Sequence, residues 1–330
     1  MKKVLITDYA WKSLDPEREI LEKVGATLVV AETGGEEELK HLAPAADCIL
    51  TCWKKVTEPV IRNAERCLAI GRYGIGLDNI AVACATTLGI VVTNVPAYCL
   101  EEVSDHAMAL LLSSARKITA FDRAIKSGVY NLQAETPLYR LRGRTLGILG
   151  FGKIGRTLAR KALAFGLRVI AYDPLFQKSA EFAEVEAVSF EDLLRGSDYI
   201  SIHVPATPET RHAFNRDAFR LMKRSAVLIN TARGEVVDED ALLWALDSNE
   251  IAGAALDVLS KEPPDPGYAL IGHPKVVATP HAAFNSEESL LELQKTAASQ
   301  MASVLSGEMP QSVVNPEVLK QSNLRPAFKK

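Results

Sequence analysis

The sequence has few cysteines, no long apolar run and no excess of positive charge. Its five cysteines all lie within the first hundred residues and form no Cys-x-x-Cys pair, which favours reduced thiols in a cytoplasmic protein over a disulfide scaffold. No stretch of about 18 consecutive apolar residues occurs, so we expect no membrane-spanning helix. The 38 basic and 41 acidic side chains give a formal net charge of −3, and we therefore expect no direct binding of nucleic acid.

The length of the chain exceeds what one hydrophobic core usually serves. The sequence has 330 residues, of which 48% are hydrophobic and 24% are charged. These fractions are typical of globular chains, so disordered and collagen-like classes are excluded. The length favours two domains.

Short apolar runs alternate with helix-length segments along the whole chain. This alternation is typical of parallel α/β layers, and runs that are apolar throughout are typical of strands buried on both faces. The first series of predicted strands comprises residues 4–7, 27–31, 48–51, 68–72 and 90–93. The second series comprises residues 145–149, 168–172, 199–204, 226–230, 254–258 and 276–279. We predict two doubly wound parallel-sheet domains.

Two longer segments show helical spacing. Apolar side chains recur every three or four positions in residues 101–126, which predicts one long helix. Residues 287–305 show the same spacing, and Pro310, Pro316 and Pro326 follow them in a loop-like end. We expect the helix at 287–305 to pack back on the first domain, which would make that domain discontinuous in sequence.

A glycine-rich turn stands between a predicted strand and an apolar helical segment. It contains Gly150, Gly152 and Gly155, and Asp173 ends the next predicted strand, 173 − 155 = 18 residues later. These glycines allow a tight turn, a close approach to a pyrophosphate and close helix packing, while the helix N-terminus offers N–H groups to the anion. Asp173 suits the ribose hydroxyls and would repel a 2′-phosphate. The pattern predicts a Rossmann domain that binds NAD; a turn that only shapes an α/β crossover is the alternative.

Three ionisable residues, Arg233, Glu262 and His281, follow successive predicted strands of the second series. The carboxyl ends of parallel strands meet at one edge of a sheet. Reduction of a 2-keto acid needs a guanidinium to clamp the carboxylate, an acid to protonate the developing alkoxide and a carboxylate to keep that acid charged. Taken singly, each residue is better explained as a loop or surface residue, whereas the three together, after successive strands and downstream of the glycine turn, favour a catalytic set. No histidine or cysteine spacing predicts a metal site.

Motifs along nearly the whole chain carry a family resemblance. They occupy residues 74–80, 94–107, 150–155, 203–210, 230–238, 261–264 and 279–283, together with Asp257. In these stretches the sequence resembles the D-2-hydroxyacid dehydrogenase family, which includes phosphoglycerate dehydrogenases, glyoxylate and hydroxypyruvate reductases and the C-terminal binding protein co-repressors.

The resemblance implies an NAD-dependent oxidoreductase that interconverts a D-2-hydroxy acid and a 2-keto acid. It implies that Arg233, Glu262 and His281 are catalytic, with His281 as the acid in reduction and the base in oxidation. Beyond the three glycines of the turn, the implied cofactor contacts are Ser104, Lys153, Ile154, Asp173, Pro205, Thr210, Thr231, Ala232, Asp257 and Ala283. The implied substrate contacts are Gly74, Ile75, Gly76 and Arg233.

The same resemblance implies how the chain is divided. Residues 1–97 plus 287–330 would form a flavodoxin-like substrate-binding domain, and residues 98–286 would form the Rossmann NAD-binding domain. Members of the family are usually homodimers joined through the cofactor domain, so we expect a homodimer.

The loop after the strand at 48–51 departs from phosphoglycerate dehydrogenases. Those enzymes carry an arginine and a serine in this loop, whereas this chain has Cys52, Trp53, Lys54 and Lys55. Lys54 or Lys55 could still meet an anion as a point charge, and we take Lys54 as a substrate-contact candidate. Trp53 could cap an apolar substrate side chain or fill a gap in the core. Which 2-hydroxy acid is used therefore stays open.

Two stretches, residues 94–106 and 172–174, are closer to the co-repressor branch of the family. In that branch the dinucleotide controls partner binding and catalysis is incidental. The sequence has no basic localisation run and no long disordered tail, and Arg233, Glu262 and His281 are all present. We therefore predict an enzyme, with an NAD(H)-sensing interaction protein as the alternative.

Overall fold

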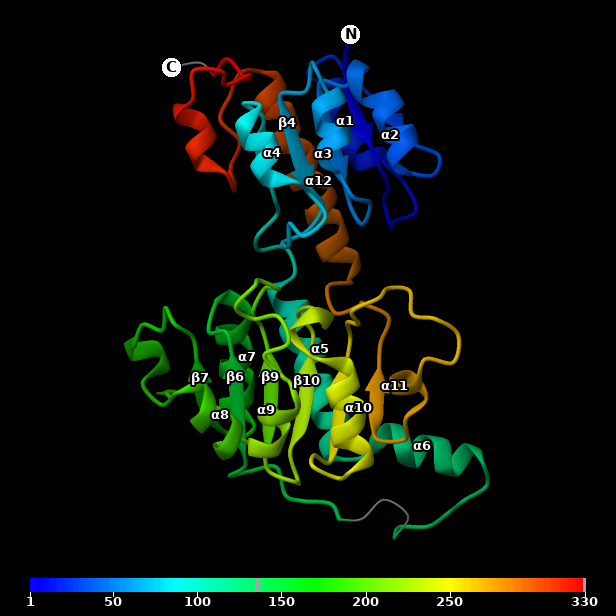
Figure 1. Ribbon diagram of the computed structural model, residues 1–330, viewed down its shortest axis with the longest axis vertical. Helices are drawn as coiled ribbons and strands as arrows, with labels where there is room; N and C mark the ends of the chain where they lie inside the picture. The colour runs from blue at the N-terminus through cyan, green and yellow to red at the C-terminus, as the bar shows by residue number, and fades with distance from the viewer. Residues whose placement is uncertain (134–136, 329–330) are drawn as a thin grey trace. The chain divides into compact units, whose positions relative to one another are not determined.

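The computed structural model describes residues 1–133 and 137–328, and the chain forms two compact units (Figure 1). Unit 1 comprises Met1–Tyr98 together with Ser286–Lys330, and unit 2 comprises Cys99–Asn285. Each unit has its own parallel sheet, so the predicted class of two doubly wound α/β domains, the first discontinuous in sequence, is confirmed. Among the described residues, no helix combines the length and apolar character needed to cross a membrane.

Unit 1 is built on a five-stranded parallel sheet with the order β2-β1-β3-β4-β5, the doubly wound order of flavodoxin-like folds. Its strands are β1 (Lys2–Ile6), β2 (Ala26–Val30), β3 (Cys48–Thr51), β4 (Ala69–Arg72) and β5 (Val91–Thr93). Its helices before the crossing to unit 2 are α1 (Asp15–Glu22), α2 (Glu36–Leu42), α3 (Glu58–Asn63) and α4 (Val82–Thr87).

The helix α12 (Glu287–Leu305) returns the chain to unit 1 and packs against α1 and β4. Its N-terminus is closed by a capping box in which Ser286 and Ser289 bond each other's backbone N–H. Gln294 Nε2 on this helix donates to Glu17 Oε2 of α1 at 2.9 Å. These contacts join the two ends of the sequence into one core.

Unit 2 is built on a seven-stranded parallel sheet with the order β12-β11-β10-β9-β6-β7-β8. Its strands are β6 (Thr145–Leu149), β7 (Arg168–Tyr172), β8 (Glu186–Ala187), β9 (Tyr199–Ile202), β10 (Val227–Asn230), β11 (Gly253–Leu256) and β12 (Val276–Ala278). The predicted strands of both series are present, with ends shifted by at most two residues. The short, exposed β8 was not predicted because its two residues carry no apolar pattern.

Helices cover both faces of the sheet in unit 2, and a buried apolar cluster lies on each face. The helices are α5 (Leu100–Ala115), α6 (Ile118–Lys126), α7 (Lys153–Ala164), α8 (Phe190–Gly196), α9 (Arg216–Leu221), α10 (Glu239–Asp247) and α11 (Ala269–Gly272). Burial on both faces explains why strands such as β6 and β9 are apolar at successive positions.

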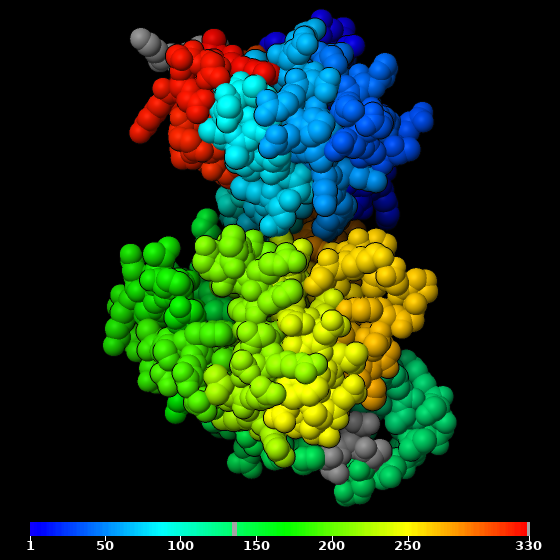
Figure 2. Space-filling view, in the orientation of Figure 1, coloured from blue at the N-terminus to red at the C-terminus, as the bar shows by residue number. Residues whose placement is uncertain are grey.

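The prediction of one helix over residues 101–126 is wrong. Lys117 has a left-handed φ of 56° and separates α5 from α6. The helix α5 packs one face against the sheet, whereas α6 has no buried residue and stands at the outer side of unit 2 (Figures 1 and 2). Apolar spacing continues through the break, so periodicity alone did not reveal it.

Candidate active site

The glycine turn lies between β6 and α7, at the carboxyl edge of the sheet in unit 2. Gly150 has a φ of 91°, and a Cβ there would lie 2.7 Å from the backbone oxygen of His203. A Cβ on Gly155 would lie 2.3 Å from the oxygen of Gly150, so the helix packs directly on the turn. A Cβ on Gly152 would meet nothing within 4 Å. This open side lies beside the first turn of α7, whose N–H groups have no helical acceptor.

Asp173, which directly follows β7, reaches the glycine turn. Its Oδ2 accepts the N–H of Phe151 at 2.7 Å, and its Oδ1 accepts the N–H of Leu175 at 2.8 Å. A carboxylate has about four acceptor positions. Asp173 therefore keeps acceptor capacity for hydroxyl donors of a ligand held at the turn.

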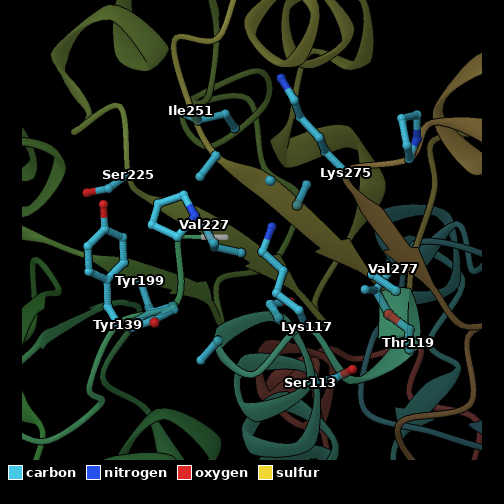
Figure 3. Close-up of a pocket in the computed structure, with 18 of the residues that line it drawn as sticks. Ser113, Lys117, Thr119, Tyr139, Tyr199, Ser225, Val227, Ile251, Lys275 and Val277 are labelled. Carbon is cyan, nitrogen blue, oxygen red and sulfur yellow. The ribbon is translucent and has the colours of Figure 1, made fainter. Parts of the chain in front are cut away.

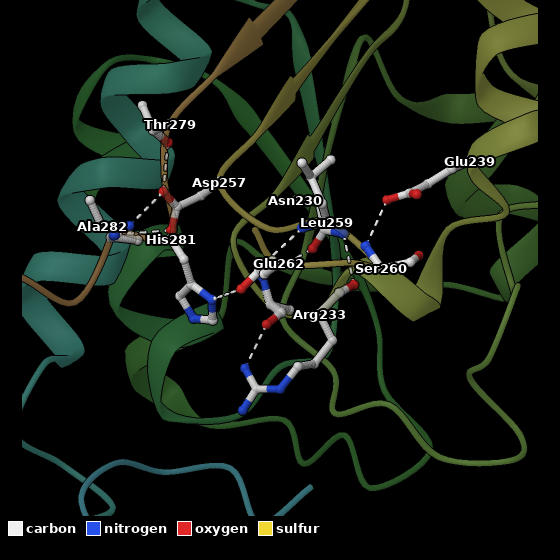
Figure 4. A network of polar contacts seen from close by, with 12 residues as sticks. Asn230, Arg233, Glu239, Asp257, Leu259, Ser260, Glu262, Thr279, His281 and Ala282 are labelled. Carbon is white, nitrogen blue, oxygen red and sulfur yellow. Dashed lines mark hydrogen bonds and ion pairs between the residues drawn. The ribbon is translucent and has the colours of Figure 1, made fainter. Parts of the chain in front are cut away.

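His281 and Glu262 form a pair at the same edge of the sheet (Figure 4). The distance from His281 Nδ1 to Glu262 Oε2 is 2.6 Å. The other carboxylate oxygen, Oε1, accepts the N–H of Leu259 at 2.8 Å, which orients Glu262. The two side chains are 25% and 33% exposed, respectively, so the pair remains accessible to a ligand.

Asp257 holds the loop that carries His281. Three consecutive N–H groups bond to this one residue: His281 N to its backbone oxygen at 2.8 Å, Ala282 N to Oδ1 at 2.9 Å and Ala283 N to Oδ2 at 2.9 Å. His281 has a left-handed φ of 53°, a conformation that costs a non-glycine residue energy. The bonds to Asp257 stabilise it.

Arg233 follows β10 and is half-buried. Its Nη1 donates to the oxygen of Ala232 at 2.7 Å. The Asn230 side chain donates to the oxygen of Arg233 at 2.8 Å and accepts the N–H of Ala232 at 3.0 Å. A Cβ on Gly234 would lie 2.1 Å from the backbone of Leu259, so the Arg233 turn contacts the loop that orients Glu262. The three predicted catalytic residues thus gather at one edge, as Figure 4 shows.

The other cofactor candidates in unit 2 differ in their surroundings. Ser104 on α5 is fully buried, and its Oγ accepts from Lys161 Nζ of α7 at 2.7 Å. The oxygen of Pro205 accepts from Thr210 Oγ1 at 2.6 Å, which closes a local loop. The buried Thr231 Oγ1 has no hydrogen-bond partner among the described residues. Buried polar groups are normally hydrogen-bonded, so this hydroxyl is a candidate for a hydrogen bond with a bound ligand.

The predicted substrate contacts Lys54 and Gly74–Gly76 belong to unit 1. Gly74 has a φ of 146°, and a Cβ there would lie 2.9 Å from the guanidinium of Arg72. Trp53 is 42% exposed, and Arg72 Cζ lies 5.8 Å from the centroid of its ring. Trp53 therefore does not fill a core gap, and it forms part of the surface of unit 1.

Three residues that support this site were not identified from the sequence. Asn230 orders the Arg233 loop, and Thr279 and His106 join the Asp257 network. Asn230 stands three residues before Arg233, a position that could have indicated a loop-ordering side chain. His106 lies on α5, 173 residues before Thr279 in the sequence, and no sequence pattern indicates that contact.

A cavity of about 950 Å³ opens at the opposite, amino edge of the sheet in unit 2 (Figure 3). Its lining includes Tyr199 and Val227 at the starts of two strands, and Lys117, Arg123 and Lys275. No residue predicted for the site is part of that lining. The candidate active site is thus the cluster at the carboxyl edge.

The comparisons with known proteins agree on one family. The family model for the NAD-binding domain of D-isomer specific 2-hydroxyacid dehydrogenases matches residues 108–283. A D-3-phosphoglycerate dehydrogenase of Methanocaldococcus jannaschii is 38% identical over 326 residues, which are 98% of this chain and 61% of that relative. A glyoxylate reductase of Korarchaeum cryptofilum is 41% identical over 265 residues, or 79% and 80% of the two chains. The chain thus spans less than two thirds of the length of the first relative.

Solved structures give the same result. The D-lactate dehydrogenase from Aquifex aeolicus, complexed with NAD and lactic acid, superposes with a TM-score of 0.86 at 27% identity, covering 95% of this chain and 99% of that one. A glyoxylate reductase from Paecilomyes thermophila superposes with a TM-score of 0.87 at 27% identity, covering 96% and 99%.

Proposed function

The chain belongs to the family of D-isomer specific 2-hydroxyacid dehydrogenases, and from that premise we propose that it interconverts a D-2-hydroxy acid and its 2-keto acid with NAD(H). The observation that carries the proposal is the 2.6 Å contact of His281 Nδ1 with Glu262 Oε2. This pair lies with Arg233 at the carboxyl edge of the sheet that forms the family's NAD-binding domain.

NAD fits the residues at the glycine turn. The open side of Gly152, the N–H groups of Lys153 and Ile154, and the unpartnered hydroxyl of Thr231 support this fit. When bound, the cofactor supplies a hydride in reduction and takes one up in oxidation. Asp173 would accept hydrogen bonds from the ribose hydroxyls and repel a 2′-phosphate.

His281 is the proposed acid in reduction. Because Nδ1 faces Glu262, the proton for the substrate oxygen leaves from Nε2. Glu262 stabilises the positive charge on the imidazole before that transfer and fixes the ring by the hydrogen bond. In oxidation the same nitrogen takes the proton from the hydroxyl group.

The proposed substrate contacts hold the carboxylate. Arg233 can bind it with two parallel N–H···O bonds. In unit 1, the backbone of Gly74, Ile75 and Gly76 is proposed to contact the substrate, and Lys54 to act as a point charge for an anionic substrate. The guanidinium of Arg72 beside Gly74 adds positive charge there.

We also propose a homodimer joined through unit 2. The segment after α5 exposes several large apolar side chains, and a patch of this kind marks an interaction surface. These side chains are Ile118, Ile125, Val129, Tyr130 and Leu132. Light scattering should give twice the chain mass for the native protein and a single chain mass for the I118K/I125K double variant. The matched control is Ile271→Lys on α11, whose side chain is similarly exposed at 44%; a native protein of single chain mass contradicts the dimer.

The proposed location is the cytoplasm. All five cysteines are buried and none is in a disulfide bond in the described chain. Reduced, buried thiols are typical of proteins from reducing compartments.

The central test is a substrate screen that follows NADH oxidation with glyoxylate, hydroxypyruvate, its phosphate ester, pyruvate and bulkier 2-keto acids. We expect turnover with at least one of them, and a much slower reaction with NADPH. Absence of turnover with every acid, in a protein that binds NADH, contradicts the enzyme and favours an NAD(H)-sensing interaction protein.

A further inference from the structure

A chain of hydrogen bonds joins α5 to the loop that carries His281. His106 Nε2 lies 2.9 Å from Thr279 Oγ1, and Thr279 Oγ1 lies 2.6 Å from Asp257 Oδ1. The same Oδ1 accepts the N–H of Ala282 (Figure 4). We propose that His106 and Thr279 are positioning residues that hold Asp257, and through it His281, in the reactive geometry; the proposal rests on the proposed function.

The chemistry of the three groups sets the direction of these hydrogen bonds. Both oxygens of the Asp257 side chain accept backbone N–H groups, so the Thr279 hydroxyl donates its proton to Oδ1. The Thr279 oxygen must then accept from His106, which places a proton on His106 Nε2. We call this arrangement the His106–Thr279–Asp257 link.

The link runs from a helix that is packed in the core to a loop residue with an unfavourable backbone conformation. His106 is carried by α5, whose neighbouring residues Ala107 and Met108 are buried in the core against the sheet. At the other end, His281 has the left-handed φ of 53°. Asp257 is 2% exposed, so water has little access to replace a lost hydrogen bond at its carboxylate. Loss of the Thr279 hydroxyl would therefore let Oδ1 turn and loosen the loop.

The two carboxylate oxygens of Asp257 accept hydrogen bonds from different groups. Oδ1 accepts from both Thr279 and Ala282, while Oδ2 accepts the N–H of Ala283. A carboxylate oxygen has two acceptor positions, so Oδ2 retains one for the implied cofactor contact. Damage to the link on the Oδ1 side should consequently change the rate of proton transfer more than the affinity for NADH.

The experiment compares Thr279→Val, which removes the hydroxyl at nearly constant shape, with Thr279→Ser, which keeps it. We expect Thr279→Val to lower kcat about 10- to 100-fold, the scale of a small misplacement of a catalytic group, while KM and the Kd for NADH change less than about 3-fold. Thr279→Ser should keep kcat within about 3-fold of the native value. An unchanged kcat in Thr279→Val, or equal losses in both variants, overturns the proposal.

Hydrogen exchange provides a readout that needs no turnover. We expect the amide of Ala282 to exchange at least about 10-fold faster in Thr279→Val than in the native protein, and at the native rate in Thr279→Ser. Unchanged exchange in Thr279→Val overturns the link. If the native protein reduces no 2-keto acid, the proposed function fails, and the exchange rates still decide whether the link holds the loop.

A second pair of variants covers the case in which Thr279→Val does not fold. His106→Gln keeps an N–H donor on a side chain of similar reach, whereas His106→Leu has no donor. The link predicts a kcat within about 3-fold of native for His106→Gln and a loss of about 10-fold or more for His106→Leu. Equal activities in these two variants contradict the proposal.

Discussion

Each unit uses an aspartate at the carboxyl edge of its sheet to hold the loop of a neighbouring strand. In unit 1, Asp8 follows β1 and accepts the N–H groups of Cys52 at 3.0 Å and Trp53 at 2.7 Å, after β3. In unit 2, Asp257 follows β11 and accepts those of Ala282 and Ala283, after β12. Both pairs of strands are adjacent and parallel, so the same backbone geometry recurs.

The two loops differ in what they carry. The Asp8 loop carries an exposed tryptophan and Lys54, and Thr7 Oγ1 supports Asp8 at 2.7 Å. The Asp257 loop carries His281, which faces Glu262 at 2.6 Å. An aspartate that binds consecutive N–H groups is therefore a general way to order a loop at a sheet edge. Chemistry requires in addition an ionisable group on that loop and a partner for it, as His281 has in Glu262 on the loop after β11.

The largest effect should come from His281, the proposed acid on the Asp257 loop. His281→Asn keeps a hydrogen-bonding side chain but removes the acid, so kcat should fall by about 10²- to 10⁴-fold. NADH binding, followed by fluorescence titration, should stay within about 3-fold of native because the lost interaction belongs to the transition state. A variant that retains a tenth of the native kcat contradicts the assignment.

A third aspartate at the sheet edge, Asp173, should determine the preference for NADH over NADPH. Asp173→Ala removes the charge that would repel a 2′-phosphate, so the ratio of kcat/KM for NADH over NADPH should fall about 10- to 100-fold. Steady-state kinetics with both cofactors measure this ratio. Asp173 also accepts the N–H of Phe151, so Asp173→Asn serves as the control that keeps an acceptor; an unchanged ratio in both variants refutes the ribose assignment.

The matching change in unit 1 is Asp8→Ala, which frees the loop of Trp53 and Lys54. If this loop contacts substrate, KM for the 2-keto acid should rise about 10-fold while kcat changes less, because binding rather than proton transfer is affected. Steady-state kinetics measure the two constants. A fall of kcat comparable to that in His281→Asn would mean that the two loops do not divide binding and chemistry.

Acid should weaken unit 2 through His203. Burial lowers the pKa of this imidazole from 6.5 to about 4, so the unfolded chain takes up a proton more readily between these values and stability falls as pH falls through that window. The full pKa shift corresponds to roughly 3 kcal/mol of unfolding free energy. Because the whole residue is only partly buried, we expect the unfolding free energy to fall by less, about 2 kcal/mol. Denaturation at pH 7 and 4 should show a smaller loss for His203→Gln; equal losses contradict this.

The smallest effect concerns a carboxyl group in unit 1 and has the opposite sign. Burial raises the pKa of Glu17, although hydrogen bonds from Gln294 and Tyr73 oppose the shift. Its contribution to stability is therefore greatest below the ordinary pKa and is lost as pH rises through the raised value. Relative to the native protein, Glu17→Gln should therefore gain stability between pH 4 and 8. Denaturation midpoints that keep a constant difference over this range contradict the prediction.

Structural features that depend on residues close together in the sequence were predictable from the sequence. All strands except β8, together with α12 and the glycine turn, depend on local patterns, and the structure places them within two residues of the prediction. The positions of Arg233, Glu262 and His281 after successive strands predicted their meeting because parallel strands end at one edge. In this sense the class of the fold and the ionisable core of the site were determined by the sequence alone.

Only the tertiary structure determined which residues hold the loops around Arg233, Glu262 and His281 in place. Asp8 and Cys52, like His106 and Thr279, are far apart in sequence, and their hydrogen bonds form only when separate strands and helices pack together. The break at Lys117 was likewise hidden, because the left-handed φ of one residue leaves the apolar spacing on both sides unchanged. Periodicity reports which face of an element is buried, whereas the partner that a polar side chain meets depends on the packing of the whole unit.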